Sequence, residues 1–227
     1  MGFYLGIDLT SSERKPSGCA VLDDSAALVD VARLSTDAAI LALAEAHHPR
    51  LAAIDAPLFY PKGWHCLEWP CPQGICPPPE GALRAAEREL YRRGISLYAT
   101  TKKSFIKPMI YRAIGLRACL EAMSIKVIEI YPYASKVQLF GKPVPKKTTA
   151  AGRQWLRERL EGLVPGLGER EGRLSHDELD AVVAAYTAYL HGRGLAEEVG
   201  DPEEGVIVVP RGHERALVHV CGNPRAK

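Results

Sequence analysis

Short apolar segments separated by polar turns open the chain and predict strands. The segments FYLGID (3–8), SGCAVLD (17–23) and AALVDVARL (26–34) follow one another closely and predict an antiparallel meander. The pattern then changes to a helical period in TDAAILALAEAHH (36–48), which precedes the apolar run LAAID (51–55). Because parallel strands need a crossover of this kind, we expect residues 51–55 to lie beside residues 3–8.

Helices and strands alternate again in the second part of the chain. We expect helices at 80–93, 106–123, 148–163 and 175–194, and strands at 126–131, 205–210 and 215–220. Before them, a loop rich in proline and cysteine forms an insert over about 57–80. This order predicts an α/β fold, in which residues 1–227 form a single domain around a mixed sheet with helices on both faces.

An acidic residue stands at the end of each strand that is expected to be central. Asp8 and Asp55 end neighbouring parallel strands, so their carboxylates should lie about 5 Å apart across the ladder. Glu129 ends the next apolar strand and should stand one strand further away. The carboxyl ends of parallel strands are where open α/β sheets bind ligands.

Two further acids begin the helix at 175–194. Ser175 and Glu178 form a capping box, which places Asp177 in the first turn and Asp180 three residues later on the same face. Asp177 could instead only complement the helix dipole, and the strand-end acids could only accept backbone hydrogen bonds.

The electrostatic repulsion between these acids indicates that a cation binds among them. Two carboxylates 5 Å apart repel by about 3 kcal/mol at an effective dielectric of 20. A divalent ion reverses that sign, and carboxylate oxygens favour Mg²⁺ or Mn²⁺. We therefore expect Asp8, Asp55 and Asp180 to bind the metal, with Asp177 and Glu129 as supporting catalytic acids.

Basic residues and cysteines complete the candidate chemistry. Arg88, Lys102 and Lys103 are candidates for binding the phosphates of a nucleic acid, although each is also compatible with an ordinary solvated surface charge. The insert contains Cys66, Cys71 and Cys76 in a C-x4-C-x4-C pattern, without the paired C-x2-C spacing of a typical zinc site. A structural metal, a disulfide and free thiols all stay open.

Composition limits the class of protein only broadly. The chain has 47% hydrophobic and 25% charged residues and a net charge of +2, which neither requires nor excludes a nucleic-acid partner. A secretory signal and an apolar run long enough for a bilayer are both missing from the sequence, so we expect a cytoplasmic protein without membrane contact. A homodimer is compatible with this chain.

Several motifs together resemble a known family. They resemble a family of predicted nucleases with an RNase H-like fold, catalogued as a domain of unknown function and distantly similar to Holliday-junction resolvases. The matching segments are GIDLT (6–10), AIDAPL (53–58), ERELYRRGI (87–95), EIYP (129–132), HDELDAVVAAYTA (176–188) and PEEGVIVVP (202–210). The resemblance implies a five-stranded sheet of order 3-2-1-4-5, with metal-binding acids on the first strand, the fourth strand and a late helix.

These observations favour a hydrolase, a metal-dependent nuclease that cleaves DNA or RNA phosphodiester bonds with a metal-activated water. One alternative is an ATP-binding phosphotransferase-like protein of the actin and hexokinase superfamily, because GIDLTSS (6–12) also fits the first phosphate loop of that group. The other alternative is a binding protein that keeps the same fold without turnover.

Overall fold

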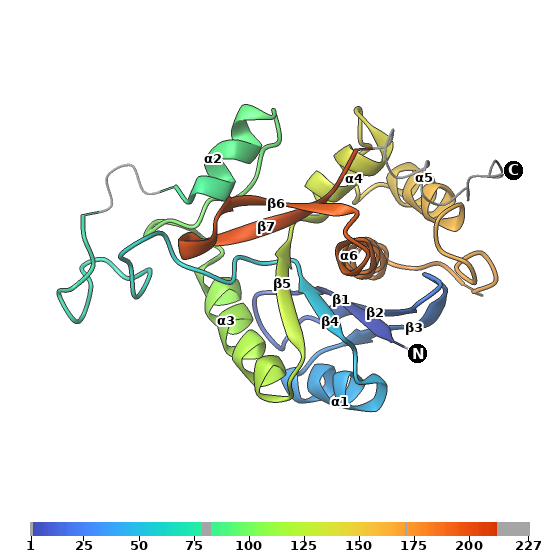
Figure 1. The fold of residues 1–227 in the computed structure, drawn as a ribbon, viewed down its shortest axis with the longest axis horizontal. Coiled ribbons are helices and arrows are strands. Elements are labelled where there is room, and N and C mark those ends of the chain that lie inside the picture. Colours follow the sequence, from blue (N-terminus) through green and yellow to red (C-terminus); the bar gives the residue numbers. More distant parts are fainter. Residues whose placement is uncertain (1, 79–82, 171, 213–227) are drawn as a thin grey trace, which may run out of the picture.

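A seven-stranded mixed sheet forms the centre of the computed structural model, which describes residues 2–78, 83–170 and 172–212 (Figure 1). Its order is β3-β2-β1-β4-β5-β7-β6. The strands are β1 (Phe3–Asp8), β2 (Ser17–Asp23), β3 (Leu28–Leu34), β4 (Leu51–Ile54), β5 (Lys126–Ile130), β6 (Ala196–Asp201) and β7 (Gly205–Pro210). Strands β1 to β3 form the expected antiparallel meander, and β4 lies parallel to β1 as expected.

The expected sheet of five strands is wrong in its number of strands. The first five strands follow the expected order 3-2-1-4-5, but β7 pairs in parallel with β5 and β6 pairs antiparallel with β7. The sequence of β6, AEEVGD, was not expected to form a strand because it is short and acidic. Such charged segments are typical of sheet edges, which is where β6 lies. The strand expected at 215–220 falls outside the described residues.

Six α-helices are present in the described part of the chain. They are α1 (Asp37–His47), α2 (Ala85–Arg92), α3 (Lys107–Ala122), α4 (Pro132–Phe140), α5 (Ala150–Glu161) and α6 (His176–Gly192). Helix α4 was not among the expected helices, and it begins with Pro132, a residue more often found in loops. That proline is the first residue of α4, where the N–H that proline lacks would have no hydrogen-bond partner within the helix.

No helix among the described residues is long and apolar enough to span a membrane.

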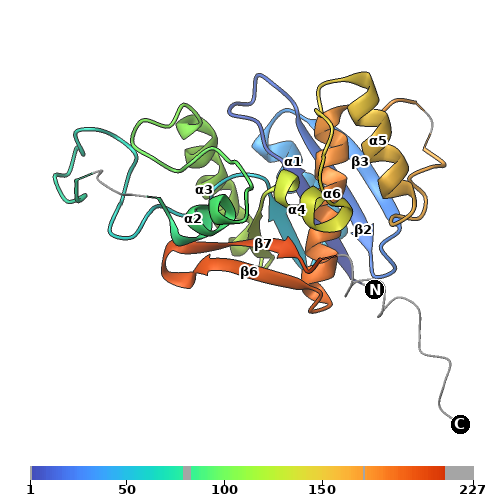
Figure 2. The ribbon, with the colours of Figure 1, turned by 90° about the horizontal axis from the view of Figure 1, so that it is seen from above.

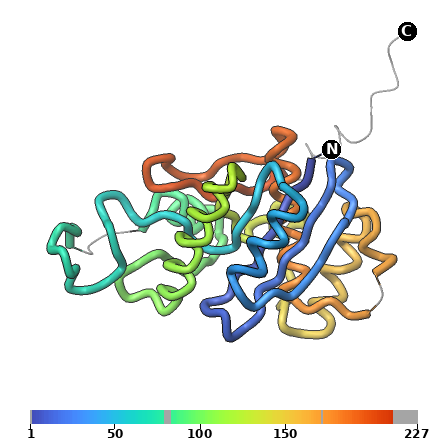
Figure 3. Tube along the Cα trace, turned by 90° about the horizontal axis from the view of Figure 1, so that it is seen from below, coloured from blue at the N-terminus to red at the C-terminus, as the bar shows by residue number. Residues whose placement is uncertain are grey.

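Successive side chains of each strand point to opposite faces of the sheet, so the core has a part on each face. Leu5 and Ile7 of β1 pack on the face that α1 and α3 cover, together with Ile54 of β4. Tyr4 points to the opposite face, where Ala184 and Ala188 of α6 pack. Figures 2 and 3 show the two sides, and both place the loop 55–78 at the opposite end of the molecule from β2 and β3.

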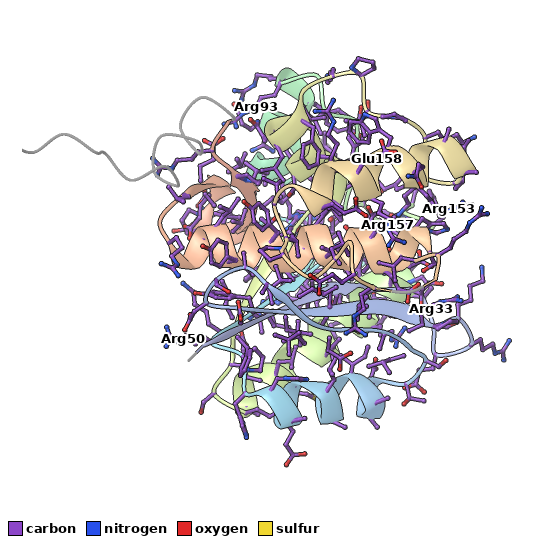
Figure 4. All side chains as sticks on the ribbon, turned by 90° about the vertical axis from the view of Figure 1, so that its right-hand side faces the viewer. Arg33, Arg50, Arg93, Arg153, Arg157 and Glu158 are labelled. Carbon is purple, nitrogen blue, oxygen red and sulfur yellow. The ribbon has the colours of Figure 1, made fainter. Side chains whose placement is uncertain are left out.

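Helix α6 lies directly on the sheet because glycines face it. A Cβ atom added at Gly6 would lie 2.1 Å from the carbonyl oxygen of Ala181, and one at Gly18 would lie 2.1 Å from that of Asp177. On its outer side α6 packs against α5, so that it is buried between the sheet and a second helix (Figure 4). The absence of these two side chains therefore sets the height of the N-terminal turns of α6 above the end of β1.

A methyl group at Gly6 should destabilise the fold. We expect Gly6→Ala to lower the free energy of unfolding by about 1–3 kcal/mol, because the rigid backbone of α6 must move away from β1. Urea denaturation measures the loss. Gly115→Ala in α3 is the matched control, since nothing lies within 4 Å of its added Cβ and a helical alanine is favourable. Equal stability of Gly6→Ala and the wild type would contradict this account of the packing.

Candidate metal centre

Asp8 and Asp55 meet at the carboxyl ends of β1 and β4. The parallel register pairs Ile7 with Ile54, and the backbone N–H of Asp55 continues the ladder by donating to the Ile7 carbonyl oxygen at 2.8 Å. The two carboxyl groups lie close enough to share a hydrogen bond when one of them is protonated. Asp8 is 6% exposed, so its carboxylate has little access to water.

The first turns of α6 bring two more acids and a histidine to the same place. Ser175 and Glu178 form the expected capping box, which fixes where the helix begins. Asp177 and His176 follow the cap, and one ligand atom from each of them and from Asp8 lie within 4.8 Å of one another. His176 was not among the expected ligands.

Asp180 reaches the site but is already paired. Lys136 of α4 lies with its Nζ 2.8 Å from Oδ1 of Asp180, and Lys147 lies with its Nζ 2.7 Å from Oδ2. Both oxygens are therefore held by ammonium groups, and Asp180 is not free to act as the metal ligand that the sequence led us to expect. Lys147 also lies 3.9 Å from Oδ2 of Asp8, so one ammonium bridges the acids of the strand and the helix.

The remaining groups fit a cation. Oδ2 of Asp8 and Nδ1 of His176 are buried and have no hydrogen-bond partner. Nδ1 of His176 lies 2.7 Å from Oδ1 of Asp177 without hydrogen-bond geometry. Ligands bound 2.1 Å from one octahedral ion are about 3 to 4 Å apart, and the ligand atoms of this group lie within 4.8 Å of one another, close enough to meet one ion after small side-chain movements. We therefore assign Asp8, Asp177 and His176 as the residues that could hold a metal.

The charge of the site also favours a divalent ion. When all are ionised, Asp8, Asp55, Asp177 and Asp180 carry two more negative charges than Lys136 and Lys147 neutralise. Burial, reinforced by Asp55 and Asp180, raises the pKa of Asp8 well above its usual value. Burial also raises the pKa of Asp55 to about 7. Without an added cation, the site therefore retains protons on its acids near neutral pH.

Glu129 does not join this group. The register pairs Glu129 with Ile54 rather than with Asp55, so its side chain leaves the opposite face of the sheet from Asp8 and Asp55. Its two oxygens accept hydrogen bonds from the guanidinium of Arg84 at 2.5 and 2.8 Å. The backbone N–H of Leu58 donates to it as well. Glu129 thus belongs to a buried ion pair, and its expected role as a supporting acid of the metal has no geometric support.

The expected phosphate-binding residues also lie elsewhere. Lys102 is 3% exposed and donates to the carbonyl oxygen of Cys66, so it is not available at the surface. Arg88 and Lys103 are exposed but do not line the cavity at the strand ends. The cationic residues that line it are Arg84, Lys136, Lys146 and Lys147.

A cavity of about 480 Å³ opens above the acids. Its lining includes the acids Asp8, Asp55, Asp177 and Asp180 and the aromatic residues Tyr98, Tyr131 and Tyr133. The ring of Tyr98 is 65% exposed and contacts Phe105 edge to face, with ring centroids 4.9 Å apart. The site thus combines a buried acidic floor with an accessible aromatic rim.

The three cysteines of the insert gather as well, away from this cavity. Their sulfur atoms lie within 4.8 Å of one another. The backbone N–H of Cys76, which donates to the sulfur of Cys71, lowers the pKa of Cys71 to about 6. All three are free thiols in the structure.

Comparison with known proteins places the chain in a family. The family model described as "Protein of unknown function (DUF429)" matches residues 6–205. The chain belongs to this family. The match runs from β1 to the start of β7, so the acidic site and the cysteine insert both lie within the DUF429 region. No curated protein matches the chain.

Among solved structures, the DUF429 chain is similar to Thermus thermophilus RuvC. The similarity covers 85% of this chain and 96% of RuvC, with 15% sequence identity and a TM-score of 0.47. At this distance the similarity assigns no activity and no residue roles.

Replacing Asp55 should stabilise the metal-free protein at high pH. Its folded pKa, about 7, lies above the unfolded value of about 4, so the wild type loses stability as pH rises between these values. We expect Asp55→Asn to raise Tm by at least about 3 °C at pH 8 in EDTA, the equivalent of about 1 kcal/mol in a chain of this size. Scanning calorimetry should show the gain shrinking towards pH 4. A lower Tm of Asp55→Asn at pH 8 would contradict this prediction.

Removing the Lys147 ammonium should tighten metal binding. Lys147 lies among the acids that a divalent ion would also approach, so the two cations repel each other. We expect Lys147→Gln to bind Mn²⁺ about tenfold more tightly, as measured by calorimetric titration. Lys146→Gln is the matched control, because the side chain of Lys146 makes no ion pair in the described structure and should leave the affinity nearly unchanged. Weaker Mn²⁺ binding by Lys147→Gln would argue against competition.

Proposed function

We propose that this DUF429 protein is a metal-dependent nuclease with an RNase H-like fold, which hydrolyses phosphodiester bonds of DNA or RNA. One observation carries the proposal: a buried oxygen of Asp8 has no hydrogen-bond partner, and ligand atoms of Asp8, Asp177 and His176 lie within 4.8 Å of one another beside an open cavity that Asp8 and Asp177 line. The strand order 3-2-1-4-5 within the sheet supports the fold assignment. The preference of paired acids for hard divalent ions supports the chemistry.

The residues divide into three roles in this proposal. Asp8, Asp177 and His176 would hold the ion, which when bound would polarise a phosphoryl oxygen and make water more acidic. Asp55, whose pKa is about 7, lies beside Asp8 and can accept a proton from an attacking water. Lys147 is 40% exposed and can turn towards a non-bridging phosphate oxygen.

The presence of His176 changes which metal ion we expect at the site. The expectation of Mg²⁺ or Mn²⁺ assumed ligands made only of oxygen atoms. A nitrogen ligand next to two carboxylates favours a transition metal such as Mn²⁺ over Mg²⁺. We therefore propose Mn²⁺ as the more effective activator.

The rim of the cavity fits an unpaired nucleotide better than a regular duplex. Tyr98 and Phe105 expose aromatic surface where a base can stack, and stacking of this kind does not depend on sequence. The buried floor, by contrast, is reached only by a group that enters the cavity. We propose substrates with single-stranded or distorted segments.

Cleavage assays test the proposed activity directly. Labelled single strands, duplexes, hybrids and branched DNA are incubated with Mn²⁺ or Mg²⁺, and products are separated on gels. We expect the wild type to cut at least one substrate, and Asp8→Asn to lose about 100-fold or more of the rate. Glu158→Gln on the exposed face of α5 is the matched control for loss of one carboxylate and should retain full activity (Figure 4), while Asp8→Asn prepared in parallel detects contaminating nucleases. Equal cutting by wild type and Asp8→Asn would reject the proposal.

A further inference from the structure

The cysteine insert carries a second cluster with its own geometry. Sγ of Cys66 lies 3.6 Å from Sγ of Cys71 and 3.8 Å from Sγ of Cys76. In tetrahedral zinc sites with Zn–S bonds of 2.3 Å, neighbouring sulfur atoms are about 3.8 Å apart. The two contacts of Cys66 therefore match the edges of a zinc–sulfur tetrahedron, and all three sulfurs lie within 4.8 Å of one another.

A buried ammonium group lies beside the sulfur atoms of this cluster. Lys102 is 3% exposed, and its Nζ lies 3.9 Å from Sγ of Cys66 and 4.7 Å from the centroid of the Trp64 ring. No carboxylate of the described residues forms an ion pair with it within 4.0 Å. Because a buried cation is stabilised by an anion nearby, cysteine sulfurs deprotonated by a bound metal would neutralise it.

Charge balance then favours a divalent ion in the cluster. Three thiolates and Zn²⁺ together leave one negative charge, which the ammonium of Lys102 offsets. The backbone N–H of His65 donates to Sγ of Cys76 at 3.3 Å, a contact of the kind that orients metal-binding sulfurs. An iron–sulfur cluster fits less well, since each cysteine would bind a different iron and the sulfurs would stand farther apart.

A zinc ion in this cluster would stabilise the fold of the insert. Residues 55–78 contain no helix or strand, and loops of this length are uncommon without a special reason. Trp64 and Leu67 of the loop are buried against Ile110 of α3, Tyr60 and Cys76 pack partly against them, and the N–H of Leu67 donates to the hydroxyl of Tyr111. An ion that joins the three cysteines would fix the outer part of the loop to this small core.

We propose that Cys66, Cys71 and Cys76 bind one zinc ion, with solvent as the fourth ligand, and that Lys102 is the counter-charge of the site. The fourth position is assigned to solvent because His65 is exposed and is not part of the ligand group. Through Lys102, the zinc site would fix the segment around Tyr98, which lines the cavity and contacts Phe105.

Metal analysis of the full chain, purified with a phosphine reductant, tests the proposal. Mass spectrometry of the metals should give about one zinc per chain for the wild type and almost none for Cys71→Ser. Cys119→Ser is the matched control, because Cys119 is a free thiol on α3 outside the cluster. Asp8→Asn should also retain its zinc, which distinguishes this site from the acidic centre.

Three results would overturn the proposal. They are iron instead of zinc, zinc that is lost in Asp8→Asn but kept in Cys71→Ser, and a metal-free wild type that cannot be loaded with zinc. If Cys71→Ser does not fold, cobalt substitution of the wild type tests the site without that variant. We expect thiolate-to-cobalt charge-transfer absorption and intense tetrahedral bands, and their absence would also reject the site.

Discussion

The close contact between α6 and the sheet is the constraint on which the acidic site depends. Without side chains at Gly6 and Gly18, the backbone of α6 lies directly on β1 and β2. This contact places the first turn of the helix beside the end of β1, so Asp177 meets Asp8 although they are far apart in the sequence. Any side chain at these glycines would lift the helix and separate its acids from those of the strands. Packing and chemistry are thus set by the same contact.

The acids gathered in this way oppose folding unless their charge is offset. Lys136 and Lys147 offset part of it through Asp180, and the raised pKa values of Asp8 and Asp55 show that part remains. A network in which protons compensate for missing cations is typical of functional sites rather than of structural ion pairs. The buried contacts of Arg84 with Glu129 and Glu87 are a useful contrast, because one guanidinium pairs directly with both carboxylates beside the same cavity.

Much of the fold follows from patterns in the sequence. The meander, the α1 crossover and the position of β4 beside β1 could be predicted, because in those segments the period of the apolar residues and the positions of the turn residues indicated the same elements. Helix α4 and strand β6 could not, since a proline at a helix start resembles a loop and an acidic edge strand lacks an apolar face. The five-stranded sheet that the family resemblance implied lacks β6 and β7.

The site was predicted in part for similar reasons. Strand-end acids and the capping box of α6 bring Asp8, Asp55 and Asp177 together as expected from local rules. Glu129 could not be placed, because a shift of one residue in register changes the face that a side chain occupies. The partners of Asp180 and the role of His176 depend on tertiary contacts between α4, the following loop and α6. One sequence signal could have predicted the pairing of Asp180: Lys136 in YASKVQLF stands among apolar helical positions, where a buried lysine needs an acidic partner.

The central claim is that Asp8, Asp177 and His176 form a metal site. Anomalous diffraction from crystals grown with Mn²⁺ tests it most directly. We predict a manganese peak about 2.0–2.6 Å from Oδ2 of Asp8 and from an oxygen of Asp177, with Lys147 moved away from Asp8. Crystals that show no peak at saturating Mn²⁺, with Lys147 still bridging Asp8 and Asp180, would contradict the account.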